Sequence, residues 1–486
     1  MLRKAILLGA FTTGCTFFMP PQQKKDLQGF TAGFINSFSA IKTLIESLYD
    51  YQVELTKYEY NTEEYHQQRS IIHQRVADRI LRLSIENKGV YLKAGQYIGN
   101  LERVMPREFT QTLRVLQDQG PQVSFEDVKI VLEYEFQKPI QELFTTFSHK
   151  AIAAASLAQV HQATYDGKDV AVKVQFPQLR VQYRYDLMII HNIAKLCDFV
   201  VSNTSTSQLN FSDLFSTFRK ALEKELDFTL EVQNAEITRN NFKNNSRIYI
   251  PQFYQYSQRV IIMEFIDGVK INDVNKLKNP RECANILIDM FGQMIFKHGH
   301  VHCDAHPGNI LIREQNGKQQ LVLLDHGFYT DIDQEMLQNF RCLWNNIAKF
   351  NYKQVEQYAL KLGIKKDHIE FLPLIFFYRT ISSKKKLGDA FSIEERQYLR
   401  NKDLVTLENI NALLRSMPPE IMFIIRAANL VGIHNALLGG TTRDRLLKFT
   451  EYSVKNSEKS VWKQKFEWIK LKIALFLFEF FGLIPK

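Results

Sequence analysis

The pattern of apolar and polar residues over the first 145 positions favours helices. Residues 36–85 combine mixed charge with few helix breakers and are predicted to form a helix, and residues 108–145 are again predicted to be helical, ending near Pro139. Between them, residues 84–100 (SIENKGVYLKAGQYIGN) are punctuated by glycine. This part of the chain therefore predicts a helical preface with one glycine-punctuated segment.

The pattern changes after residue 150, where short apolar runs predict strands. VAVKVQF (170–176) is rich in valine, and RVIIMEFI (259–266) is followed by the turn signal Asp267-Gly268. Further on, a loop is predicted to enter a strand at HCDAHPGNILI (302–312), and QLVLLDHG (320–327) predicts a strand that ends at Asp325. Helices are predicted at 179–200, 211–245 and 281–299, and through most of 333–450.

This order of elements predicts an α+β body with two lobes, a small β-containing lobe followed by a mostly helical one. The 486 residues correspond to about three domain-sized units. The predicted parts are a targeting or membrane-anchor segment (1–25), a helical N-terminal extension (36–145), an N-lobe (146–266), a C-lobe (267–450) and a basic-apolar tail (451–486).

Composition and charge narrow the classes of partner. Apolar residues make up 45% and charged residues 23%, which excludes global disorder. With 62 basic and 52 acidic residues the net charge is +10, and most of the excess lies within residues 1–25 and 455–472, each next to an apolar run. This placement favours a membrane surface with anionic lipid, and no nucleic acid, as the partner.

The apolar runs at the two ends of the sequence each allow more than one interpretation. The apolar run 5–19 follows Arg3 and Lys4 and is short for a bilayer span, so a secretory signal, an organelle-targeting segment and a membrane anchor all fit. Five cysteines without a CxxC pair disfavour a disulfide-rich secreted protein. The run 468–485 is interrupted by charges and predicts either an interfacial helix or a terminal helix docked on the body.

Candidate chemistry begins with Asp304 and Asn309, which are five positions apart in HCDAHPGN, and with Asp325 in LLDHG. The catalytic loop of protein kinases has the same separation between its catalytic Asp and its metal-binding Asn. Asp304 would orient a nucleophile or accept its proton, while Asn309 and Asp325 would supply oxygen ligands to Mg²⁺.

A strand lysine and a helix glutamate complete this set. Lys173 lies in the predicted strand VAVKVQ, and Glu231 on a later helix is its candidate partner at the phosphates of ATP or ADP. A lysine that faces a closed site needs such a carboxylate, because an unpaired buried charge is costly. Taken alone, the two residues fit better a solvated strand lysine and a surface glutamate.

The histidines of this region raise a zinc site as an alternative. His298, His300, His302, Cys303 and His306 lie close together in sequence, but their spacing matches no standard zinc motif and no second cysteine pair follows. His302 is therefore predicted to be a structural residue of the loop.

An alanine-rich segment, AAASLA (153–158), occupies the place of a glycine-rich phosphate loop. Alanine at 153, 155 and 158 would be costly if these positions required a positive φ, so the segment should hold phosphates differently or favour a different nucleotide. The residues predicted to bind nucleotide are Ala153, Ala154, Ala155, Ser156, Lys173 and Glu264.

At these residues the chain resembles the UbiB or aarF-domain family of atypical, protein-kinase-like proteins, and most closely its mitochondrial subgroup. The resemblance covers about residues 60–350 and includes departures from the family pattern at Ala305, where Pro is usual, and at Ala158, where many members have Gly. The matching motifs are KAGQ (93–96), AAASLAQVH (153–161), ELD (225–227), HCDAHPGN (302–309) and LLDHG (323–327).

The resemblance implies a two-lobed protein-kinase-like fold with a helical KxGQ extension that folds over the site. Lys93 and Gln96 would enter the site as regulatory residues, with Lys93 facing Glu225 or Asp227. It also implies ATP or ADP with Mg²⁺ as cofactors and a place at the mitochondrial inner membrane, in coenzyme Q or lipid homeostasis.

Two functions remain open on this basis. One is a Mg²⁺-dependent ATPase or small-molecule or lipid kinase, and the other is a nucleotide-switched scaffold for a mitochondrial protein complex, with quinone or lipid intermediates as cargo. A conventional protein kinase fits poorly because no A-P-E segment follows Asp325. An aminoglycoside-type phosphotransferase shares the H-x-D-x₄-N loop but lacks KAGQ.

Overall fold

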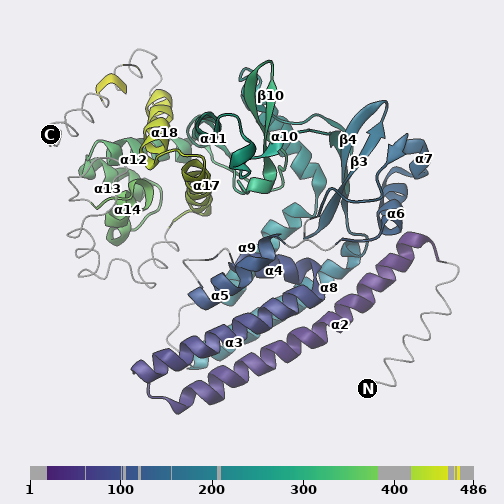
Figure 1. Cartoon of the computed structure of the whole chain (residues 1–486). Coiled ribbons are helices and arrows are strands. Elements are labelled where there is room, and N and C mark those ends of the chain that lie inside the picture. The colour runs from purple at the N-terminus through teal and green to yellow at the C-terminus, as the bar shows by residue number, and fades with distance from the viewer. Residues whose placement is uncertain are drawn as a thin grey trace. The chain divides into compact units, whose positions relative to one another are not determined.

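The computed structural model divides into two compact units, which are described separately here (Figure 1). The first comprises residues 1–230 and 252–265, and the second residues 231–251 and 266–486. The described residues are 19–60, 62–99, 101, 105–118, 122–154, 156–204, 210–380, 417–457, 465 and 468–470. Most of the predicted targeting segment, most of the C-terminal tail and Ala155 lie outside them.

The first unit contains a layer of long helices. The single helix predicted over 36–85 is wrong, because two helices occupy this region and Thr62 caps the second by accepting a hydrogen bond from Tyr65 N. A π-helical turn (Asp50–Glu54) and a 3₁₀ turn (Leu55–Lys57) separate them. The helices of the layer are α2 (Pro21–Tyr49), α3 (Glu63–Asn87), α4 (Gly89–Gly99), α5 (Arg107–Leu113), α8 (Leu179–Thr204) and α9 (Phe211–Glu225).

The glycine-punctuated segment forms helix α4, which carries KAGQ. Helix α3 ends at Asn87 because Lys88 has a φ of 56°, and α4 starts at Gly89. Gly95 lets α4 approach its neighbours, since a Cβ there would come within 2.6 Å of both Leu116 and Ser84. Close packing thus outweighs the low helix propensity of glycine.

A six-stranded antiparallel sheet forms the rest of the first unit, in the order β1-β3-β4-β7-β6 with β2 paired to β3. Val170, Val172 and Val174 of β4 point to one face, where they pack with helix α6 (Phe125–Phe136). The strands predicted at 170–176 and 259–266 are confirmed. The strands are β1 (Thr146–Phe147), β2 (Ala153–Ala154), β3 (Ala158–Tyr165), β4 (Lys168–Gln175), β6 (Phe253–Tyr256) and β7 (Val260–Glu264), and the short helices η3 (Arg114–Asp118) and α7 (Ile140–Leu143) precede them.

The second unit contains two small sheets. Strands β10 and β11 form a hairpin whose turn, Asn316-Gly317, has positive φ at both positions. A second, two-stranded sheet pairs β9 with β12. Neither strand was predicted, because each has only three residues, most of them polar, which is too few to show an alternation of apolar and polar positions. The strands are β5 (Ile248–Tyr249), β8 (Val269–Lys270), β9 (His300–His302), β10 (Ile310–Gln315), β11 (Lys318–Leu323) and β12 (Tyr329–Asp331).

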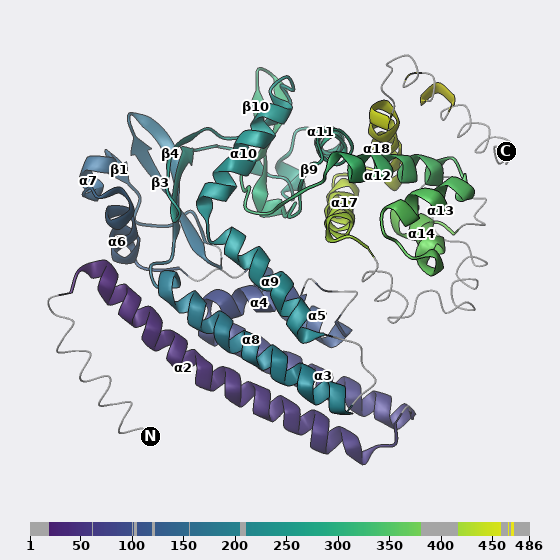
Figure 2. The ribbon, with the colours of Figure 1, turned by 180° about the vertical axis from the view of Figure 1, so that it is seen from behind.

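Helices make up the remainder of the second unit (Figure 2), and large aromatic side chains such as Phe291, Phe296 and Phe340 fill its core. The helix predicted over 211–245 is two helices, since Asp227 accepts hydrogen bonds from Thr229 N and Oγ1 and so caps α10. The helices are α10 (Phe228–Phe242), η4 (Val274–Lys276), α11 (Pro280–Gln293), η5 (Met294–His298), η6 (Pro307–Asn309), α12 (Gln334–Ala348), α13 (Tyr352–Lys361), η7 (Lys366–Phe371), α14 (Leu372–Phe377), α17 (Pro419–Leu437) and α18 (Thr442–Ser457).

Across the part of the chain that the structure describes, we find no helix with both the length and the apolar character needed to cross a bilayer.

Candidate active site

The small β9–β12 sheet brings the two aspartate segments of the second unit together. His302, the last residue of β9, is paired with Tyr329, the first residue of β12, so Asp304 follows the end of β9 by two residues and Asp325 precedes the start of β12 by four. Two segments that are about twenty residues apart in sequence therefore lie side by side. Sequence reasoning expected both aspartates at one site, but it did not predict the sheet that joins them.

His302 ties the two segments together. Its Nδ1 accepts a hydrogen bond from Asp304 N at 3.1 Å, and its Nε2 donates to the carbonyl of Asp325 at 2.9 Å. Burial lowers the pKa of His302, so the ring is neutral at neutral pH with its proton on Nε2. The prediction of a structural role fits these contacts, whereas its placement in a loop is wrong because His302 ends a strand.

Asn309 is fixed by three hydrogen bonds. Its Nδ2 donates to the carbonyl of Asp304 at 3.2 Å, and its backbone bonds to His306 and to Leu324, at the end of β11. Because the amide nitrogen is used within the loop, the amide oxygen is the atom that could ligate a metal ion.

Asp325 and Glu231 lie near each other around Gly327. The N–H of Gly327 donates to Asp325 Oδ1 at 2.8 Å, and a Cβ at Gly327 would lie 3.2 Å from that oxygen and 4.0 Å from Glu231 Oε2. Helix α10 holds Glu231, which is buried, and Asn234 of the same helix donates to the carbonyl of His326 at 3.0 Å. The carboxylate of Asp325 and the amide of Asn309 carry the kind of oxygen that suits a hard cation such as Mg²⁺.

The zinc alternative finds no support in these contacts. Among the described residues, no group of three or more His, Cys, Asp and Glu side chains is placed to hold a metal ion. His302 uses both ring nitrogens for backbone hydrogen bonds, and His306 Nδ1 accepts from Gly308 N. An oxygen site completed by a ligand's phosphates needs only two protein ligands.

A buried polar cluster supports the Asp325 segment from behind. The hydroxyl of Tyr329 accepts from Thr238 Oγ1 at 3.1 Å and donates to His326 Nδ1 at 2.8 Å, and His326 Nε2 donates to the carbonyl of Leu323. Burial raises the pKa of Tyr329 far above its ordinary value, so the hydroxyl stays protonated and keeps this direction. Sequence reasoning missed Tyr329 and Thr238, which carry no motif signal.

Helix α17 contributes two further residues that the sequence did not indicate. Arg426 Nη2 lies 3.2 Å from Asp304 Oδ1, and both side chains are partly exposed. His434 Nε2 donates to the carbonyl of Ala305 at 2.8 Å. The loop that carries Asp304 is thus restrained by a helix more than a hundred residues further along the chain, a distance over which no spacing rule operates.

In the first unit, Lys173 lies on β4 between Val160 of β3 and Ile261 of β7. Its Nζ is 5.0 Å from the centre of the Phe228 ring. Glu264 ends β7, and its Oε2 accepts from Gln252 N at 3.2 Å. Lys173 belongs to the first unit and Glu231 to the second, so their pairing stays a prediction.

The alanine-rich segment is not wholly a loop, because Ala153 and Ala154 form strand β2 and pair with Val160 and Gln159 of β3. Ser156 is buried, and Ala158 already belongs to β3. Neither Ala153 nor Ala158 has a positive φ, so the strain expected of alanine at these two positions is absent. Ala155 lies outside the described residues.

The KAGQ helix makes the expected contact with the ELD segment. Lys93 Nζ lies 2.5 Å from Glu225 Oε2, whereas Asp227 caps α10. Gln96 Nε2 donates to the carbonyl of Leu116 at 2.8 Å, which ties α4 to the turn after α5. Lys93 thus pairs with Glu225, and the regulatory role of these four residues stays a prediction.

Comparisons with known proteins agree with these motifs. The family described as "ABC1 atypical kinase-like domain" matches residues 115–359. The chain is 32% identical to AarF domain-containing protein kinase 1 of Mus musculus, over 93% of this chain and 87% of that protein. It is 34% identical to the probable serine/threonine-protein kinase abkD of Dictyostelium discoideum, over 83% of this chain but only 59% of that protein's length.

A solved structure shares the fold. The structure of the Rv3197–erythromycin complex from Mycobacterium tuberculosis matches 82% of this chain and all of that chain, with a TM-score of 0.52 at 19% identity. The mixed α+β fold expected from the order of helices and strands is confirmed. Together, the family match and the extent of the similarity to its members show that this chain belongs to the ABC1/AarF family of atypical kinase-like proteins.

Proposed function

We propose that this protein binds ATP or ADP with Mg²⁺ and catalyses phosphoryl transfer, as an ATPase or as a small-molecule or lipid kinase. The observation that carries the proposal is the bridge made by His302, which fixes Asp304 and Asp325 beside each other. Phosphoryl transfer depends mainly on positioning and on neutralising charge, so this arrangement suits that reaction.

Each candidate site residue then has a defined role in phosphoryl transfer. Asp304 orients the attacking hydroxyl or water and accepts its proton. Asn309 and Asp325 hold Mg²⁺, which neutralises phosphate charge when it is bound. Lys173, with Glu231 as its partner, contacts the phosphates, while the alanine-rich hairpin and Glu264 contact the rest of the nucleotide.

The direct test is ATP hydrolysis by the full chain in solution, with Asp304→Asn beside the unchanged protein. We expect turnover to fall by about 10²-fold or more while nucleotide affinity stays within a few-fold, because the substitution removes the proton acceptor but keeps the shape. Asp273→Asn is the matched control, since Asp273 is an exposed acid of the same unit and pairs with Lys276. Equal turnover in Asp304→Asn and the unchanged protein would contradict the proposal.

A second candidate, a nucleotide-switched scaffold, is favoured by the Arg426–Asp304 ion pair. The guanidinium of Arg426 forms an ion pair with Asp304, the proposed proton acceptor, and so competes with a nucleophile for the same carboxylate. If catalysis is the function, Arg426→Gln should raise turnover a few-fold, whereas Arg281→Gln, which breaks an ion pair with Asp444, should not. No turnover in any variant despite nucleotide binding would favour the scaffold.

We further propose, from the family resemblance, that the protein acts at the mitochondrial inner membrane in support of coenzyme Q or lipid homeostasis. The basic and apolar residues at both ends of the sequence support a partner surface of anionic lipid. Quinone or lipid intermediates, or a mitochondrial protein complex, would be its cargo or partners. Import of the full chain into isolated mitochondria, followed by carbonate extraction, tests this placement.

A further inference from the structure

Helix α2 of the first unit has its apolar residues on the outside. Between Phe30 and Tyr49, every exposed residue is large and apolar except Lys42. Phe34 is 54% exposed, Phe38 59% and Ile45 61%. The exposed apolar residues, which we call the outer face of α2, are Phe30, Phe34, Ile35, Phe38, Ile41, Ile45 and Tyr49.

The inner side of the same helix is small or polar. The buried residues of α2 include Gly29, Gly33, Asn36 and Ala40, and no large apolar residue is among those buried. A Cβ at Gly29 would lie 2.7 Å from the carbonyl oxygen of Gln178, so α2 packs tightly on α8. A helix on a water-facing surface has the opposite arrangement, with its large apolar residues turned inward.

The exposed side of α8 continues this character. Met188, Leu196 and Phe199 are exposed, the last at 67%, and two cations, Arg184 and Lys195, are exposed beside them. The two helices lie next to each other in both ribbon views (Figures 1 and 2), and Phe30 of α2 packs edge-to-face on Tyr185 of α8.

The acids of these two helices all have partners within the first unit. Asp186 is buried and accepts hydrogen bonds from Gln182 and Asn36, while Asp198 accepts from the backbone of Phe211 and Ser212. Glu46 pairs with Arg79 of α3 and with Lys42.

Asp26 of α2 accepts from Gln22. Among the residues that the structure describes on α2 and α8, the charged residues on the exposed surface are therefore positive, namely Lys42, Arg184 and Lys195.

We propose that the outer face of α2, together with the exposed side of α8, lies in the interface of a bilayer leaflet that contains anionic lipid. Burial of large apolar side chains at the acyl boundary would supply the affinity, and the exposed cations would meet the lipid phosphates. From Phe30 to Tyr49 the helix is about 29 Å long at 1.5 Å per residue, which is enough for it to lie flat over many lipids. The assignment rests on the proposed membrane association and names the surface that performs it.

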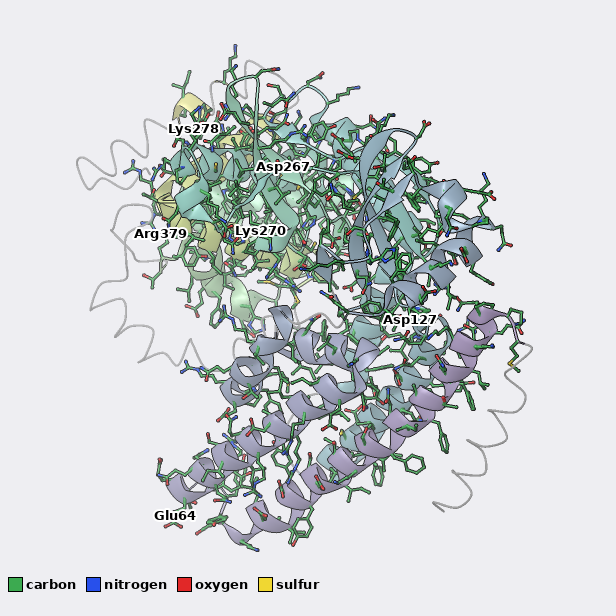
Figure 3. The ribbon with its side chains drawn as sticks, turned by 45° about the vertical axis from the view of Figure 1, so that its right-hand side comes forward. Glu64, Asp127, Asp267, Lys270, Lys278 and Arg379 are labelled. Atoms are coloured by element: carbon green, nitrogen blue, oxygen red, sulfur yellow. The ribbon has the colours of Figure 1, made fainter. Side chains whose placement is uncertain are left out.

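The sequence before α2 supports lipid over a second copy as the occupant. Residues 1–19 lead directly into the helix and carry only basic charges, Arg3 and Lys4, ahead of an apolar run. A copy of the same surface would set like charges against each other, whereas an anionic leaflet complements them. Figure 3 shows where the surface lies, because α2 extends from the end of the layer near Asp127 toward the end near Glu64, and side chains project freely from its outer side.

The test is co-sedimentation of the full chain with phosphatidylcholine vesicles, with and without phosphatidylglycerol. We expect the unchanged protein to bind the anionic vesicles and Phe38→Glu/Ile45→Glu to lose at least tenfold in apparent affinity. Leu360→Glu is the matched control, because Leu360 is an apolar residue on a helix of the second unit and is 50% exposed. Binding of the double variant equal to that of the unchanged protein would overturn the proposal and assign binding to the ends of the chain.

A second measurement keeps the proposal testable if the charged variant folds poorly. Phe34→Trp should show a blue-shifted emission, relative to the unchanged protein, when anionic vesicles are added, and no shift would overturn the proposal. A dimer in the absence of lipid that Phe38→Glu/Ile45→Glu dissociates would also overturn it, in favour of a second copy. Nucleotide hydrolysis is measured separately, without vesicles. A failure of the vesicle-binding experiment therefore does not bear on the proposed phosphoryl transfer.

Discussion

The β9–β12 region of the second unit and the outer face of α2 in the first both depart from the usual distribution of residues, but in opposite directions. Around β9 and β12, polar side chains such as His302, His326 and Tyr329 are buried, and hydrogen bonds within the unit hold them in place. On α2, large apolar side chains are exposed instead.

The difference shows whether each region is stabilised by contacts within the protein or by contact with another surface. A buried polar group costs free energy unless it is hydrogen-bonded, and the β9–β12 cluster meets that condition internally, so it can act as a rigid support for chemistry. An exposed apolar face gains nothing from water, and its stabilisation has to come from another surface. The first departure is consistent with the proposed phosphoryl transfer, and the second with the proposed lipid partner.

The largest effect is expected at His302. His302→Ala removes both the acceptor for Asp304 N and the donor to the Asp325 carbonyl, so we expect turnover to fall by about 10²-fold or more through loss of positioning. His298→Ala is the control, because His298 is a partly buried histidine of the same unit and burial lowers its pKa to about 4. If His302→Ala and His298→Ala lose the same amount of stability and also the same amount of turnover, His302 has no special positioning role.

Removing one aromatic ring from a buried position and one from the exposed face of α2 sharpens the comparison. Phe340 of α12 is fully buried, and Phe340→Ala should cost about 3–5 kcal/mol of unfolding free energy. Phe34→Ala on α2 should change it by less than about 0.5 kcal/mol in the absence of lipid, because that ring is already in contact with water. Urea denaturation of each variant measures the difference, and a large cost at Phe34 would show that this ring stabilises the fold without any partner.

A pH effect is expected at the contact between α2 and α8. Burial raises the pKa of Asp186 from its ordinary 3.8 to about 7, so the folded protein holds this proton more tightly than the unfolded chain. The resulting stability is fully present below about pH 4 and is lost as the pH rises through about 7, at up to about 1.4 kcal/mol per pH unit.

Asp186→Asn should remove this dependence, so the unchanged protein should lose stability relative to the variant between about pH 4 and about pH 7. Chemical denaturation across that range measures it. Asp78→Asn, at an exposed acid of α3, serves as the control. Parallel curves for Asp186→Asn and the unchanged protein would exclude this origin of the pH dependence.

The smallest effect is expected from the ion pair between Lys93 and Glu225. Both side chains are about one-quarter exposed, so Lys93→Ala should cost only about 0–1 kcal/mol of unfolding free energy. If Lys93 is regulatory, as the resemblance implies, nucleotide affinity should change although stability does not. Isothermal titration with ADP measures this, and unchanged affinity would leave the pair a purely structural contact.

Local patterns in the sequence predicted much of the fold and of the candidate site. The strands around Lys173 and at 259–266 were predicted correctly, because valine- and isoleucine-rich runs bounded by turns carry a short-range signal. The segment 36–85 was predicted as one helix, since the break at Asp50–Lys57 contains neither glycine nor proline. The alanine-rich segment was predicted as a loop because nothing in its letters indicates that Ala153 and Ala154 pair with β3.

The sequence by itself determined which chemical groups the protein carries and in what order, namely Lys173, Glu231, Asp304, Asn309 and Asp325, because their spacing is a local property of the chain. Only the tertiary structure decided that His302 bridges two of these segments and that Arg426 pairs with Asp304.

The tertiary structure also decided that the apolar stripe of α2 faces outward. Periodicity shows that a helix has an apolar side, but the direction of that side depends on what packs against the other one. On α2 the small residues Gly29 and Gly33 fit closely on α8, and this contact turns the phenylalanines away from the core.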